Sequence, residues 1–95
     1  MILSFGDKET EKVFNQVFSR QLPENIQKVA LRKLILIDNA NCLNDLRVPP
    51  SNHLEKLSGE LFGRWSIRIN NQWRICFIPL EDGKNYIDVS IVDYH

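Results

Sequence analysis

Polar and apolar residues alternate in two short runs between Arg64 and Ile78, in the segment R-W-S-I-R-I-N-N-Q-W-R-I-C-F-I. A period of two in aromatic and β-branched residues is typical of half-buried strands, and the polar Asn-Asn-Gln segment between the runs predicts a hairpin turn. A three-residue turn, Asn70-Asn71-Gln72, keeps one face of the hairpin apolar, whereas a two-residue turn mixes the faces. The expected cross-strand pairs are Trp65 with Phe77, Ile67 with Ile75, and Ile69 with Trp73.

The same register places two arginines opposite each other on the polar face of the hairpin. Arg68 faces Arg74 directly, and like charges at such a position repel each other. Because arginine cannot lose its proton, the pair is easily explained if an anion such as a phosphate lies between the two guanidinium groups. The alternative is that both side chains extend into water or pair with nearby acidic residues, at little cost on a surface. The sequence leaves both interpretations open.

Two segments in the N-terminal half have the apolar spacing of helices. The first is expected from Asp7 to Phe18, with acidic residues in its first turn. Pro23 suits the first position of the second helix, which is expected from Glu24 to Asp38. The apolar side of the first helix contains Val13, Phe14, Val17 and Phe18. The apolar stripe of the second contains Ile26, Val29, Ala30, Leu34 and Ile37. The side of the second helix predicted to face solvent contains Gln27, Lys28, Arg32 and Lys33.

Shorter segments complete the predicted sheet. Met1 to Phe5 is expected to form an edge strand, His53 to Leu57 a short strand, and Asn85 to Val92 a last strand that alternates through Ile87, Val89 and Ile91. The connector from Asn39 to Asn52 is rich in turn residues. Because short connections favour antiparallel neighbours, the sequence predicts an α+β fold with two N-terminal helices packed on one face of a small antiparallel sheet. At 95 residues we expect a single domain over residues 1–95.

Composition and charge narrow the classes of function. The 12 basic and 12 acidic residues balance, and the pI is near 6.7, so positive charge for a nucleic-acid ligand must be local. Cys42 and Cys76 are too few and too far apart for a zinc motif, and we expect reduced thiols and neither a bound metal nor a cofactor. No apolar run resembles a signal peptide or spans a bilayer, so the expected location is the cytoplasm, without membrane contact.

Three segments together resemble a known family. They are the G-R-W-S-I-R-I-N-N-Q-W-R-I-C-F hairpin, the R-V-P-P-S-N segment from Arg47 to Asn52, and the terminal V-D-Y-H. In this order, after two short helices, they resemble the HigB-type, or plasmid-maintenance killer, branch of the RelE superfamily of bacterial toxins, over essentially the whole chain. The resemblance implies a RelE-like fold and metal-independent cleavage of messenger RNA in the ribosomal decoding site. In that reaction the ribose 2′-hydroxyl attacks the adjacent phosphate and the 5′-oxygen leaves.

The resemblance also implies catalytic roles for individual residues. Arg74, after the second hairpin tryptophan, would stabilise the charge that develops at the phosphate, with Arg68 opposite it. His95 and Tyr94 match the C-terminal acid–base and base-stacking positions, and Asp93 would orient His95 or support the terminal backbone. The simpler interpretation of the last residues is a frayed terminus, with Tyr94 closing the sheet.

Three further residues are candidates for RNA binding, namely His53, Lys56 and Arg64. Some members of the family carry a histidine and a lysine on the strand before the hairpin, where this chain has Glu55 and Ser58. His53 and Lys56 are each displaced by two positions, a shift that keeps the same face of a strand. Glu55 is an alternative general base. The simpler interpretation of His53 and Lys56 is that they are solvated surface residues.

The partners implied by the resemblance are a cognate helix-turn-helix antitoxin of the HigA type, the ribosome and messenger RNA. Operator DNA would be reached only through the antitoxin. Two other classes of function compete with the nuclease: a module of the same fold that occupies the ribosome or a partner without cutting, and a purely structural subunit of a regulatory complex. Intact RNA with toxicity that still requires Arg68 and Arg74 would identify the first, and dispensability of every polar-face residue the second.

Overall fold

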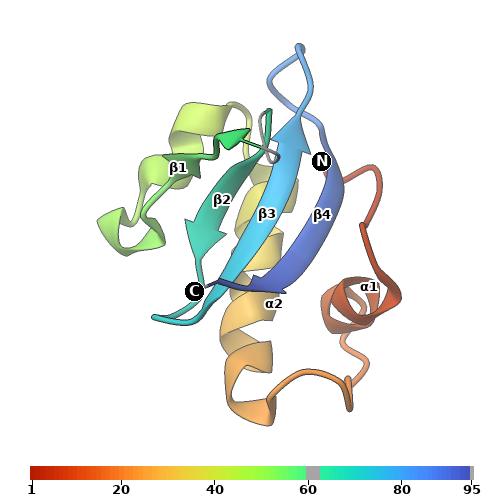
Figure 1. Cartoon of the computed structure of the whole chain (residues 1–95). Coiled ribbons are helices and arrows are strands. Elements are labelled where there is room, and N and C mark those ends of the chain that lie inside the picture. The colour runs from red at the N-terminus through yellow and green to blue at the C-terminus, as the bar shows by residue number, and fades with distance from the viewer. Residues whose placement is uncertain (60–62, 95) are drawn as a thin grey trace.

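The computed structural model describes residues 1–59 and 63–94, which form two helices, two short 3-10 helices and a four-stranded antiparallel sheet (Figure 1). The helices are α1 (Lys8–Phe14) and α2 (Glu24–Asn39), and the 3-10 helices are η1 (Leu43–Arg47) and η2 (Pro50–Asn52). The strands are β1 (Glu55–Lys56), β2 (Trp65–Arg68), β3 (Trp73–Pro79) and β4 (Tyr86–Asp93). Strand order follows chain order, β1-β2-β3-β4. The predicted α+β fold is confirmed, with α2 crossing behind the sheet and α1 packed against α2 and β4.

The β2–β3 hairpin has the predicted register. Trp65 pairs with Phe77, Ile67 with Ile75, and Arg68 with Arg74. The three-residue turn is held by the Asn70 side chain, whose Oδ1 accepts hydrogen bonds from the backbone N–H groups of Gln72 and Trp73, both at 2.8 Å. This local bond is typical of asparagine in turns and fixes the register at the tip.

The core lies between this sheet and α2. Ile67 and Ile75 are fully buried on the sheet, and they face an equally buried stripe on α2. That stripe contains Ile26, Ala30, Leu34 and Ile37. Trp65 and Trp73 pack against the same cluster, as expected for residues that alternate with the polar face.

Strand β4 departs from simple alternation because of a bulge at Asp88. This residue has a φ of +56°, and the register with β3 shifts between Cys76 and Ile78. A bulge adds one residue to a strand and reverses the faces beyond it. Tyr86 rather than Ile87 therefore enters the core, where its ring meets Phe77 edge-on with centroids 5.5 Å apart.

The N-terminal segment covers the outer edge of β4, which agrees with the expected edge position of Met1 to Phe5. It forms two isolated parallel bridges, Ile2 with Tyr86 and Phe5 with Val89, rather than a continuous strand. At Gly6 an added Cβ would lie 2.0 Å from Ser90 Oγ, so only glycine permits this close approach to β4.

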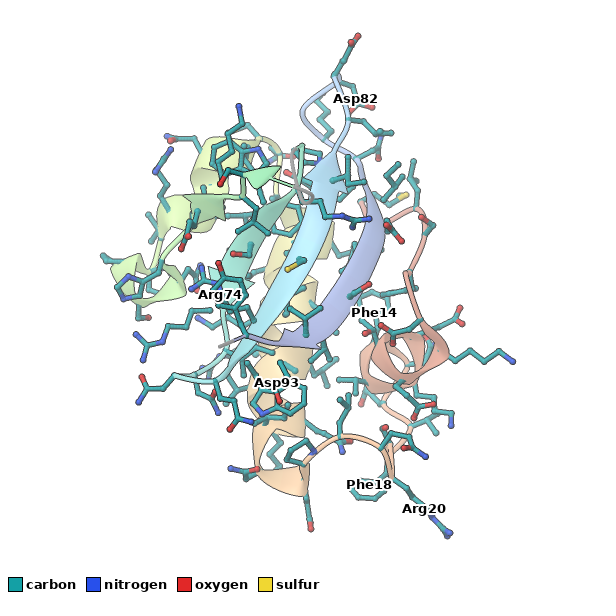
Figure 2. The ribbon with its side chains drawn as sticks, viewed as in Figure 1. Phe14, Phe18, Arg20, Arg74, Asp82 and Asp93 are labelled. Carbon is teal, nitrogen blue, oxygen red and sulfur yellow. The ribbon has the colours of Figure 1, made fainter. Side chains whose placement is uncertain are left out.

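Helix α1 is shorter than predicted, and two expected core residues are exposed. It begins after Asp7, whose Oδ1 accepts from the Thr10 N–H at 2.7 Å, and ends at Phe14 rather than Phe18. Gln16 adopts a left-handed φ of +63°, and the Val17 N–H reaches back to the Lys12 carbonyl at 2.8 Å, which together form a Schellman cap. The chain turns away there, so Val17 and Phe18 are 52% and 58% exposed, and their predicted place on a buried face is wrong (Figure 2).

Helix α2 has the predicted start and nearly the predicted end, with one exception on its polar side. Lys33, expected to face solvent, is only 5% exposed. Its Nζ donates to Oδ1 of Asn52, at the end of η2. The two 3-10 helices fold the connector over this part of α2, and that packing buries the lysine.

The cysteines and the lengths of the helices bear on the expected free thiols and the expected lack of membrane contact. Cys42 is exposed, Cys76 is buried on β3, and both are free thiols; burial raises the pKa of Cys76. None of the helices in residues 1–59 and 63–94 is long and apolar enough to cross a membrane.

Candidate functional site

A polar pocket of about 310 Å³ lies on the face of the sheet opposite α2. Because successive residues of a strand point to opposite faces, Ile75 faces α2 and its neighbour Arg74 faces the pocket. The walls come from β1, the β2–β3 hairpin and the end of the chain. The lining residues are His53, Glu55, Arg68, Asn70, Asn71, Arg74 and Tyr94. Five of the residues singled out in the sequence are therefore brought together, namely Arg68, Arg74, Tyr94, His53 and Glu55.

Arg74 forms the floor of this pocket and is only 8% exposed (Figure 2). Its Nε donates to Ser66 Oγ at 2.8 Å, and its Nη2 donates to the backbone carbonyl of His53 at 2.6 Å. Glu55 Oε2 lies 3.8 Å from Nη2, and the Tyr94 ring centroid lies 5.6 Å from the guanidinium carbon. A buried arginine stays charged and must be paired, and these contacts both pair it and fix its orientation.

Ser66 is the site residue that sequence reasoning missed. It is fully buried and holds Arg74 Nε from the neighbouring strand. A signal was available, because the predicted register places Ser66 diagonally across from Arg74 on the same face, within reach of a long side chain.

Arg68 lies at the rim of the pocket, and its guanidinium bonds the hairpin turn rather than a partner that it shares with Arg74. Its Nη2 donates to Oδ1 of Asn71 in the hairpin turn. The structure thus supplies local partners for both arginines, and Glu55 beside Arg74 is an acidic one, as the second interpretation expects; it also keeps both guanidinium groups in one pocket. These features leave the pocket able to receive an anion between them.

The end of the chain is attached to the hairpin turn (Figure 1). The Tyr94 N–H donates to the Gln72 carbonyl at 2.6 Å, and Gln72 Nε2 donates to Asp93 Oδ2 at 3.2 Å. Asp93 pairs with Trp73 across β3 and β4 and lines a neighbouring depression rather than the Arg74 pocket. His95 lies outside the described residues.

Two predicted RNA-binding residues are not brought to the Arg74 pocket. Arg64 forms an ion pair with Asp88 and lines the neighbouring depression, where Tyr94 forms the shared wall. Lys56 is the register partner of Trp65, and directly paired residues share a face, so Lys56 lies on the α2 side of the sheet. Glu55, the partner of Ser66, lies on the pocket side.

The chemistry available in the pocket is that of an anion site with one carboxylate. Two guanidinium groups can donate several hydrogen bonds to the oxygens of a phosphate, and an aromatic ring stands beside them. Over residues 1–59 and 63–94, no three histidine, cysteine, aspartate or glutamate side chains are grouped so as to share a metal ion.

Relatives in sequence point to one family. The family described as "RelE-like toxin of type II toxin-antitoxin system HigB" matches residues 3–95. Toxin HigB-1 of Vibrio cholerae serotype O1 is 41% identical over 78 residues, which cover 81% of this chain and 82% of the relative. An uncharacterized protein of Haemophilus influenzae is 44% identical over 57 residues, which cover 60% of this chain and 56% of that protein.

Solved structures agree on the fold. The chain is similar to one in the heterotetrameric YoeB–YefM toxin–antitoxin complex of Staphylococcus aureus, with a TM-score of 0.59 at 21% identity, covering 100% of this chain and 95% of the other. A second YoeB–YefM complex of the same organism gives a TM-score of 0.57 at 19% identity, covering 100% and 98%. The match in sequence, together with this shared RelE fold, places the chain in the HigB-like family, the RelE-like toxins of type II toxin–antitoxin systems.

Proposed function

We propose that this toxin is an endoribonuclease that cleaves messenger RNA on the ribosome and thereby inhibits translation. The observation that carries the proposal is the convergence of Arg68, Arg74 and Tyr94 on one polar pocket from the hairpin and the end of the chain. Membership of the RelE-like toxins supports the same activity. The pocket offers positive charge for a single backbone phosphate although the whole chain has a formal net charge of zero.

The proposed step is an internal transesterification. A general base takes the proton of a ribose 2′-hydroxyl, its oxygen bonds to the adjacent phosphorus, and the bond from phosphorus to the 5′-oxygen breaks. A general acid protonates the leaving 5′-oxygen, so the products are a 2′,3′-cyclic phosphate and a 5′-hydroxyl. Negative charge builds on the non-bridging oxygens in the transition state, where oriented donors have their largest effect.

Arg74 is the principal charge-stabilising group in this proposal. Ser66 and His53 already hold its Nε and Nη2, so the guanidinium does not need to reorganise when charge develops. Arg68, which has one side-chain partner in the turn, can follow the phosphate as it binds. Tyr94, 37% exposed beside Arg74, is placed to stack on an unpaired base.

Glu55 is the general base in this proposal. Its carboxylate lines the Arg74 pocket and lies 3.8 Å from Arg74 Nη2, whereas Lys56 lies on the other side of the sheet. The general acid is assigned to His95 by resemblance to the family alone. Glu55→Gln keeps the shape of the side chain but removes the base. Single-turnover cleavage by this variant should be slower than that of the wild type, with binding of programmed ribosomes unchanged.

The proposed partners follow from the family. A helix-turn-helix antitoxin of the HigA type would hold the toxin inactive in the cytoplasm and would carry it to operator DNA. The similar YoeB structures are themselves toxin–antitoxin complexes, which supports a protein antitoxin here. Co-purification of the toxin with the product of an adjacent small reading frame would test this partner.

Cleavage of a defined message in a purified translation system tests the nuclease. The wild type should produce fragments with 5′-hydroxyl ends only when ribosomes are present, and Arg74→Ala should produce none. Arg20→Ala is the matched control, because Arg20 is exposed and lies beyond α1, far from the pocket in Figure 2. Arrested translation on intact message, still dependent on Arg68 and Arg74, would replace the nuclease by a non-cleaving ribosome-binding module.

A further inference from the structure

Asn52 is a fully buried polar residue at the end of the R-V-P-P-S-N segment, and it joins three parts of the chain. Its Oδ1 accepts from Lys33 Nζ on α2. Its Nδ2 donates to the carbonyls of Leu46, at 3.1 Å, and Val48, at 3.3 Å. The side chain therefore fixes both 3-10 helices to the helix that lies behind the sheet.

Lys33 requires a physical explanation, because an apolar side chain would fill the same space at lower cost. The residue is 5% exposed, and burial lowers the pKa of its ammonium group. Buried charge is costly unless it is hydrogen-bonded, and here Asn52 supplies the acceptor. An ammonium group at this position gives a directional bond that a methionine or leucine cannot give.

The next residue connects this pair to the pocket. His53 has a left-handed backbone with a φ of +44°, a conformation that is disfavoured for a residue with a side chain and persists only when its surroundings hold it. Its carbonyl accepts from Arg74 Nη2 at 2.6 Å. The path from Lys33 to the guanidinium thus consists of the Lys33–Asn52 hydrogen bond, the chain from the Asn52 side chain to the His53 carbonyl, and the hydrogen bond from Arg74 to that carbonyl.

We infer that Lys33 and Asn52 are positioning residues for Arg74, which they act on by fixing the direction of the His53 carbonyl. The inference rests on the proposed function, in which Arg74 stabilises the phosphate. In this arrangement Ser66 on β2 accepts from Arg74 Nε, and the Lys33–Asn52 pair fixes the His53 carbonyl that accepts from Nη2. Neither Lys33 nor Asn52 lines the pocket.

The direct test observes the Arg74 side chain by NMR. In Lys33→Met, which keeps the length of the side chain and removes its ammonium, the signals of the Arg74 Nη2 hydrogens, which bond the His53 carbonyl, should shift and exchange with solvent about tenfold faster. Core amides such as that of Ile75 should keep their protection. Lys28→Met, the same change at an exposed lysine of α2, should leave the signal where it is in the wild type. An unchanged Arg74 signal in folded Lys33→Met would overturn the inference.

Two further variants keep the test decisive. Lys33→Arg retains a donor for Asn52 and should restore slow exchange at Arg74. Asn52→Asp retains an acceptor for Lys33 but loses the donor to the Leu46 and Val48 carbonyls, so it too should shift the Arg74 signal. If Lys33→Met does not fold, an unchanged signal in Asn52→Asp overturns the inference in its place.

Kinetics separate positioning from a general loss of structure. Misplacing a charge-stabilising group lowers kcat, and we expect a fall of about tenfold or more in Lys33→Met with KM for programmed ribosomes within about twofold. A rise in KM with kcat unchanged would contradict positioning. Absence of cleavage by the wild type would refute the proposed function, whereas the NMR comparison tests the positioning of Arg74 without any activity.

Discussion

The floor and the rim of the pocket each contain an arginine, and the two arginines lie in different surroundings. The floor consists of Arg74 and Ser66, which are both buried. The Arg74 guanidinium is held by Ser66 Oγ through Nε and by the His53 carbonyl through Nη2. The rim consists of Arg68 and Asn71, and the Arg68 guanidinium donates to Asn71 Oδ1 in the hairpin turn. Like charges can therefore share a cross-strand position when one is fixed by buried acceptors and the other turns to the hairpin tip. In the proposed function, Arg74 is oriented before RNA binds, and Arg68 adjusts to the phosphate.

The largest expected effect is on the floor, from Arg74→Lys. Lysine keeps the charge but cannot bond Ser66 and the His53 carbonyl while also facing a phosphate. Single-turnover cleavage should fall about 100- to 1,000-fold, the usual cost of losing an oriented transition-state donor. Circular dichroism should show that the variant is folded. A loss below about tenfold would show that only the charge matters and that the floor is not preorganised.

Ser66→Ala is expected to have the next largest effect. It removes the acceptor for Arg74 Nε, and hydrogen bonds to charged groups contribute about 1.5–3 kcal/mol. Urea denaturation should show a loss of this size in the free energy of unfolding, together with slower cleavage. Ser58→Ala, at an exposed serine after β1, should change stability by less than about 0.5 kcal/mol. Equal effects of Ser66→Ala and Ser58→Ala would contradict a role for Ser66 in holding Arg74.

Arg68→Ala, at the rim, should weaken activity less and in a different way. A solvent-accessible cation mainly assists binding, so KM should rise about five- to tenfold, and the difference from wild type should shrink as salt increases. The free energy of unfolding should change by less than about 1 kcal/mol, because a partly solvent-accessible charge contributes little. A fall in kcat as large as that of Arg74→Lys would erase the distinction between floor and rim.

The smallest effect is expected from Tyr94→Leu, which removes the ring beside Arg74. A partly exposed cation–π contact contributes about 0.5–1 kcal/mol, so the melting temperature should drop slightly and cleavage should slow a few-fold. Tyr94→Phe keeps the ring and should match the wild type in both measurements. Loss of activity in Tyr94→Phe would instead assign a role to the hydroxyl group.

The sequence determined the features that follow from local periodicity and turn chemistry. The hairpin register, with Arg68 opposite Arg74, followed from the requirement that one face stay apolar, since a slip of one residue exposes every core side chain. The limits of α2 followed from Pro23 and the apolar spacing. The two arginines of the pocket were therefore predictable as neighbours, because they pair directly across strands that are adjacent in the chain.

Tertiary packing decided the rest. The Schellman cap at Gln16 exposed Phe18, which follows it, and the bulge at Asp88 brought Tyr86, which precedes it, into the core in place of Ile87, because a single left-handed residue breaks the periodicity between the residues on its two sides. Lys33 became buried only because the 3-10 helices fold over α2. Glu55 faces Arg74 while Lys56 faces away because of how β1 pairs with β2. Contacts between segments far apart in the chain leave no periodic pattern in the sequence. They set the surroundings of Arg74, which the sequence could identify as a site residue but could not surround with its partners.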